Sequence, residues 1–249
     1  MSETSDFRAT PLFRLTSTYE DDLDKLSDPA LEGRIVERLG ERLAEAQTRR
    51  DNNLKSLFII DMFLAIAVSG KNFKIPGTDI STLDLPAALE ILVAISTFGL
   101  LITAAGFTTW LCYSQLLWAV MQRTARAADI DGGILADTDH FNEMSVRLFQ
   151  SEIAIAGKER FTPKRGFRAL LWIYEFCYKI VFGIIPIMHI LLVGYGLRLI
   201  FERSGYDPLH LLLYLTVFLG HVLALIIWFA PNMEFGFKMR HGPYTRKGQ

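Results

Sequence analysis

Four stretches of the chain are almost entirely apolar, and charged segments separate them. They run over residues 54–69, 87–121, 169–201 and 209–230. A helix needs about 20 apolar residues to cross the hydrocarbon core of a bilayer, and the last stretch fits this length closely. The first stretch is shorter and contains Asp61. The pattern predicts an all-α polytopic membrane bundle with four transmembrane helices.

The distribution of Lys and Arg predicts how these helices are oriented. Of 26 such residues, nine lie in residues 1–55, eight in 122–168 and four after the fourth stretch, whereas only two lie at each of the two remaining connections. Because positively charged loops stay in the cytoplasm, this alternation places both termini there. We therefore expect a protein integral to the plasma or inner membrane, with cytoplasmic N- and C-termini.

The second and third stretches are longer than the bilayer requires. A helix over residues 87–121 would be about 52 Å long at 1.5 Å per residue. The hydrocarbon core is only about 30 Å thick. We expect both helices to continue inwards into a cytoplasmic helical domain.

The connecting segments predict the rest of that domain. Residues 30–53 place Leu31, Ile35 and Leu39 on one helical stripe, which indicates an amphipathic helix. A second helix is predicted over residues 140–157, after an acidic capping cluster. The predicted order is a cytoplasmic segment (1–53), a transmembrane hairpin (54–121) with an outer loop (71–86), a cytoplasmic linker (122–168), a second hairpin (169–230) and a cytoplasmic tail (231–249).

Polar groups inside the apolar stretches are the first candidates for function, since charge is costly in hydrocarbon and often marks an ion pathway. Asp61 lies in the first stretch, and a stripe of small and weakly polar residues follows one face of the second: Ser96, Gly99, Thr103 and Gly106. These five residues are candidates for a pore or ion pathway. The alternative is structural, with the stripe permitting close helix contact and Asp61 making an inter-helix hydrogen bond.

Two histidines fall near the middle of the last two stretches. His189 and His221 should lie at similar depth on antiparallel neighbours. Two facing imidazoles are candidate ligands for a b-type haem or a metal ion. The alternative is a pair of neutral histidines that hydrogen-bond across helices. We expect no cofactor, with haem b as the minor alternative.

The remaining features narrow the class of protein. Glu175 and Lys179 stand one turn apart in the order that favours a structural ion pair. A net charge of -1 gives no support for a nucleic-acid partner. HExxH, GxSxG, Walker A and GxGxxG motifs do not occur in the sequence, which lowers the expectation of an enzyme without excluding one.

We therefore expect an ion-conducting or pore-forming membrane protein with a cytoplasmic regulatory helical domain. Its partners would be the lipid bilayer, further copies of the chain in a homo-oligomer, and a cytoplasmic protein. Two alternatives stay open. One is a non-conducting membrane anchor or accessory subunit that docks a cytoplasmic or membrane partner. The other is a b-type haem electron-transfer subunit that uses His189 and His221.

Overall fold

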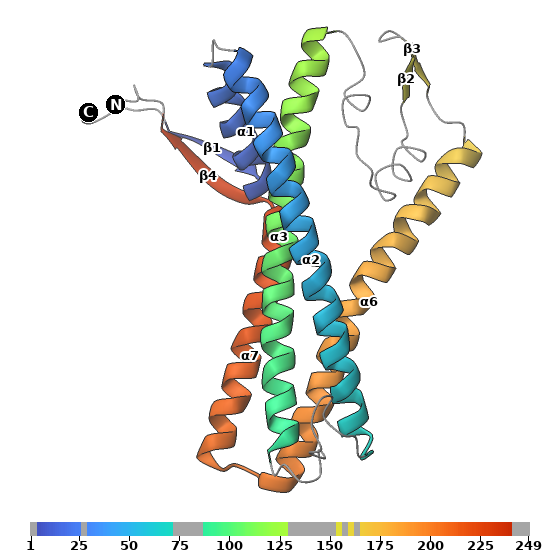
Figure 1. Ribbon diagram of the computed structural model, residues 1–249. Coiled ribbons are helices and arrows are strands. Elements are labelled where there is room, and N and C mark those ends of the chain that lie inside the picture. The colour runs from blue at the N-terminus through green and yellow to red at the C-terminus, as the bar shows by residue number, and fades with distance from the viewer. Residues whose placement is uncertain are drawn as a thin grey trace.

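Long helices dominate the computed structural model (Figure 1), which describes residues 4–25, 29–71, 87–128, 153–155, 159–161 and 165–240. The elements in chain order are β1 (Thr4–Ala9), α1 (Pro11–Asp24), α2 (Pro29–Val68), α3 (Ala88–Ala128), β2 (Ile153–Ile155), β3 (Glu159–Phe161), α6 (Arg165–Ser204), α7 (Pro208–Phe229), the 3-10 helix η2 (Ala230–Asn232) and β4 (Phe235–Arg240). The predicted helical bundle is thus confirmed in outline.

Three of these helices are long and apolar enough to cross a membrane. The segments concerned are Ala88–Ala125 in α3, Gly183–Ser204 in α6, and Pro208–Asn232, which joins α7 to η2. Their length and composition indicate association with a membrane. The first apolar stretch of the sequence forms the end of α2 and does not qualify among the described helices.

The second and third apolar stretches form overlong helices, as expected. α3 has 41 residues and α6 has 40. α2 also has 40 residues and runs without a break from the amphipathic segment into the apolar one. The domain boundary predicted between residues 53 and 54 therefore falls inside one continuous helix, and it stays a prediction. Composition changes there, but no proline or glycine is present to end the helix.

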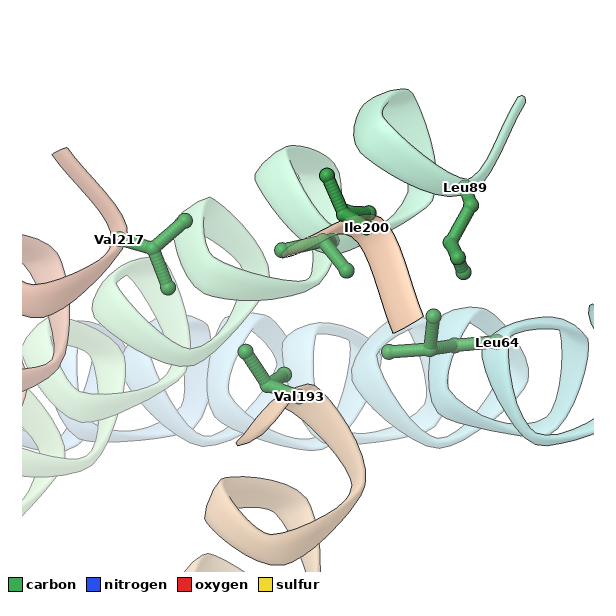
Figure 2. Packing of buried hydrophobic residues seen from close by; sticks show 6 residues of the cluster. Leu64, Leu89, Val193, Ile200 and Val217 are labelled. Carbon is green, nitrogen blue, oxygen red and sulfur yellow. The ribbon is translucent and has the colours of Figure 1, made fainter. Parts of the chain in front are cut away.

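Three buried apolar clusters lie along the bundle. The loop-end cluster, near the α6–α7 turn, contains Leu64, Leu89, Val93, Val193, Ile200 and Val217. Figure 2 shows the side chains of Leu64, Leu89, Val193, Ile200 and Val217 between the helices that carry them. The central cluster contains Leu57, Leu100, Ala104 and Ala224. The α1 cluster contains Leu23, Leu39, Leu43, Leu117 and Val120, where α1 packs against α2 and α3.

The α6–α7 turn sets the antiparallel arrangement of these two helices. α6 ends at Ser204, and the next residue, Gly205, has a φ of 60° in the left-handed region that glycine adopts without strain. The side chain of Asp207 then caps α7 by accepting a hydrogen bond from the Leu209 amide at 3.2 Å. Pro208 occupies the first turn, where its missing N–H costs nothing.

The strands and α1 were not predicted. β1 pairs antiparallel with β4 in a register that runs from Thr4 opposite Arg240 to Ala9 opposite Phe235. β2 pairs with β3, so the predicted helix over 140–157 is wrong at 153–155, while its other residues lie outside the described part of the chain. The outer loop at 71–86 also lies outside it, apart from Lys71.

Candidate functional site: a polar centre between four helices

Four helices each contribute one polar side chain to a group that lies between them. Asp61 comes from α2, Ser96 from α3, His189 from α6 and His221 from α7. His189 Nδ1 lies 2.8 Å from Asp61 Oδ2 and 3.0 Å from Oδ1. The Ser96 hydroxyl donates to Oδ1 of the same carboxylate. We refer to these four residues as the polar centre.

His221 completes the centre through its ring. The imidazole stacks on that of His189, with ring centroids 5.2 Å apart and planes inclined by 28°. Its Nδ1 lies 2.8 Å from the carbonyl oxygen of Val217, one turn earlier in α7. The two histidines and the carboxylate therefore form one coupled group.

The partners of the two rings decide which nitrogen of each carries the proton. An ionised carboxylate and a backbone carbonyl can only accept, so Nδ1 is the donor in both His189 and His221. In a neutral imidazole the other nitrogen then presents a lone pair. Nε2 of each histidine is buried and has no hydrogen-bond partner among the described residues. Each ring is thus anchored by one nitrogen and leaves the other available.

The polar centre is largely removed from solvent. Ser96 is fully buried and His189 is 2% exposed, whereas the Asp61 side chain keeps 20% of its surface. Burying a charged carboxylate costs several kcal/mol of desolvation, and well-placed hydrogen bonds are needed to offset it. Two donors supply these hydrogen bonds, because the Ser96 hydroxyl donates to Oδ1 and the single Nδ1–H of His189 is shared between Oδ1 and Oδ2. Such a group persists in an apolar bundle only where its surroundings satisfy it.

Apolar layers enclose the centre on both sides. On α2, α3 and α7, the polar residue lies between two apolar residues, each about one helical turn away. One of the two belongs to the central cluster and the other to the loop-end cluster. The triplets are Leu57, Asp61 and Leu64; Leu100, Ser96 and Val93; and Ala224, His221 and Val217. Layers of buried apolar side chains therefore lie on both sides of the polar centre along the helices.

The predicted similar depth of the two histidines agrees with the helix bounds. His189 lies about 22 Å from the end of α6 and His221 about 20 Å from the start of α7, at 1.5 Å per residue. Both values place the rings well inside a hydrocarbon core of about 30 Å, if these helices cross a membrane. The sequence predicted two separate sites, whereas the fold joins Asp61, Ser96 and both histidines into one.

The rest of the small-residue stripe on α3 faces α2. A side chain at Gly99 would meet Leu57 at 3.2 Å, and one at Gly106 would meet Asn53 at 2.9 Å. Thr103 is buried and donates to the carbonyl of Gly99 at 2.8 Å. The stripe allows α2 and α3 to approach closely. Its assignment to an ion pathway stays a prediction.

A second titratable group, which was not predicted as a site, lies near the start of α7. His210 Nδ1 is 3.2 Å from Asp207 and its Nε2 is 3.7 Å from Glu90 of α3. Tyr214 follows one turn later, with a buried hydroxyl that has no partner within the described ranges. The spacing of His210, Tyr214 and His221 on one face of α7 was the available sequence signal.

Two further predictions concern an ion pair in α6 and the binding of a metal ion. Glu175 and Lys179 both lie in α6, but their side chains are outside the described part of the structure, so their ion pair stays a prediction. Among the described residues, no set of three or more His, Cys, Asp or Glu side chains is placed to hold a metal ion. A closed structural metal site of the four-ligand kind is therefore not present in those residues.

No known protein family matches the chain, and comparisons with curated proteins and with solved structures found no match either. The functional assignment therefore rests on the residues and their geometry.

Proposed function

We propose that this protein conducts or gates cations across a membrane, and that the polar centre is the step at which the ion is handled. The observation that supports this most is the convergence of Asp61, Ser96, His189 and His221 from four helices. A charged residue at the centre of a membrane helix costs about 2.5–3.5 kcal/mol on insertion scales. Retaining such a group between two apolar layers is typical of an ion or proton pathway.

Four crossings, rather than three, are supported by the pairing of the two ends of the chain. β1 precedes all the long helices and β4 follows them, yet the two strands are hydrogen-bonded neighbours. Segments that pair must lie on the same side of a membrane, which requires an even number of crossings between them. α3, α6 and α7 supply three, so α2 is the natural fourth.

The orientation follows from charge, as the sequence predicts. Lys and Arg gather in the N-terminal segment, in residues 122–168 and after α7. In a plasma or inner membrane, the positive-inside rule then predicts that both termini lie in the cytoplasm. The β1–β4 pair would lie there as well. The α6–α7 turn and the α2–α3 connection would lie on the outer side.

In this proposal α6 is the moving element. Pro186 lies inside α6, where it removes a backbone hydrogen bond and weakens the helix locally. His189 follows three residues later and is fixed to α2 by Asp61. The first half of α6 leans away from the other helices (Figure 1). Breaking the Asp61–His189 contact would free α6 beside its weakest point.

The direct test is cation flux into proteoliposomes that contain the purified full-length protein. Asp61→Asn should reduce flux at least tenfold, because the neutral amide lacks the negative charge that attracts a cation and accepts a weaker hydrogen bond from His189. Glu45→Gln is the matched control, since Glu45 is an exposed carboxylate of the same helix that pairs with the surface residues Arg42 and Arg49. The proposal fails if Asp61→Asn folds normally and conducts as the unaltered chain does.

The accessory-subunit alternative has one observation in its favour. The first half of α6 exposes large apolar side chains, among them Trp172 at 64%, Ile173 and Phe176. Lipid covers such residues within a bilayer, but a partner would have to cover those that project from it. Purification in detergent separates the two functions. A homo-oligomer fits the ion-conducting protein, and a stoichiometric second protein fits the accessory subunit.

A further inference from the structure

We propose that the polar centre binds a divalent transition-metal ion of the zinc class through Nε2 of His189 and Nε2 of His221. This inference rests on the proposed function, because it names the class of ion that the centre would pass. The proposed site is open, with two protein ligands. It is not a closed site with three or more protein ligands, and the described residues form no site of that kind.

The first support is the way in which both rings are anchored. Histidines that bind metals almost always donate their other ring N–H to a carboxylate or a backbone carbonyl, which fixes the tautomer and directs the free nitrogen. His189 donates Nδ1–H to Asp61, and His221 donates Nδ1–H to the carbonyl of Val217. Both forms of this arrangement thus occur side by side, at adjacent rings from different helices.

The second support is the burial of the two free nitrogens. A buried acceptor without a partner costs about 1–3 kcal/mol. Nε2 of His189 and of His221 are two of only four buried side-chain atoms without a hydrogen bond in the described part of the chain. His189 itself is 2% exposed, so bulk water does not meet this need. A metal ion shared by the two lone pairs would satisfy both atoms at once.

The third support is the spacing of the rings. With a metal–nitrogen distance of about 2.0 Å, two imidazoles on a tetrahedral ion have ring centroids about 5 Å apart. Two imidazoles on opposite faces of a haem iron need about 6 Å and room for the macrocycle between them. The observed separation is 5.2 Å. The separation is too short for a macrocycle between the rings, so it disfavours haem b and is compatible with a single ion.

Charge and ligand type narrow the ion further. Asp61 gives the centre one negative charge when both imidazoles are neutral, so a divalent cation changes its net charge from -1 to +1. Neutral imidazole suits zinc, copper, nickel and iron, whereas magnesium and calcium prefer oxygen ligands. Two protein ligands also leave positions open for water. Binding is then weak enough for the ion to leave, as transport requires.

The test is metal binding to the full-length protein in detergent, measured by titration calorimetry with Zn²⁺ and by the visible absorption of Co²⁺. The unaltered protein should bind one ion and give the intense spectrum of tetrahedral cobalt. His189→Gln and His221→Gln should each weaken binding at least 100-fold. Asp61→Asn should weaken it about 10–100-fold, because it only supports a ligand. His210→Gln is the matched control and should bind normally.

Binding should also weaken as the pH is lowered, since protons compete for the same Nε2 atoms. The inference is overturned if both histidine variants bind as the unaltered protein does, if Co²⁺ gives no tetrahedral spectrum, or if the purified protein shows the Soret band of haem. If the unaltered protein binds neither Zn²⁺ nor Co²⁺ but still conducts another cation, the metal site is overturned and the proposed function stands. Binding without any cation flux would instead overturn the proposed function.

Discussion

At the scale of single residues, the members of the polar centre supply one another's hydrogen-bond and ring contacts. Asp61 accepts from both His189 and Ser96, and His189 stacks on His221. All four residues were predicted from the sequence as candidates, because polar groups in apolar stretches are conspicuous. Their assembly was not predicted, because a sequence gives the depth of a residue in a helix but not which neighbouring helix it faces.

A double-mutant cycle should show this mutual dependence as stability. Removing one partner of a buried hydrogen-bonded pair leaves the other unsatisfied and costs about 1–3 kcal/mol, and more where the remaining group is charged, whereas replacing both by apolar residues can be nearly neutral. We expect Asp61→Leu and His189→Leu each to lower the melting temperature in detergent clearly. The double variant should recover much of the loss. Additive losses in the double variant would show that the two side chains act independently.

At the scale of elements, helix lengths were easier to predict than helix boundaries. Continuous apolar runs indicated α3 and α6. The change from charged to apolar residues within α2 instead suggested two separate segments, although α2 is one helix. The start of α1 could have been recognised, since Thr10 caps it ahead of Pro11. The pairing of β1 with β4 could not, because short strands carry no signal that identifies a partner so distant in sequence.

Close helix packing around the centre makes a prediction at this scale. A side chain at Gly196 of α6 would meet Val93 of α3 at 2.9 Å, whereas one at Gly194 would meet nothing within 4 Å. Gly196→Ala should therefore destabilise the fold by about 1–3 kcal/mol through overpacking. Gly194→Ala, the matched control on the same helix, should change little. Thermal melts in detergent compare the two, and equal melting temperatures would contradict the packing.

At the scale of the whole molecule, the pairing of β1 with β4 and the alternation of positive charge support the same four-span topology. Neither depends on the hydropathy of α2, which is the weakest of the four helices in that respect. The two kinds of support are independent, because one is a hydrogen-bonded register and the other is a distribution of Lys and Arg.

Site-specific labelling tests this topology. Single cysteines are introduced at Ser2, at Thr78 and at Lys247 after Cys112 and Cys177 have been replaced by serine. In sealed vesicles, a membrane-impermeant reagent should reach positions 2 and 247 from one side and position 78 from the other. Labelling of positions 2 and 247 from opposite sides would require an odd number of crossings, in conflict with the strand pairing.

The central claim is that ion conduction requires the contact between Asp61 and His189. Exchanging the two residues with each other tests this claim most directly. Cation flux is measured in proteoliposomes for Asp61→His, for His189→Asp and for the double exchange. Each single exchange places two like groups together and should reduce flux at least tenfold. The double exchange restores one carboxylate and one imidazole and should recover flux well above either single variant. Flux within twofold of the unaltered chain in both single variants would contradict the account.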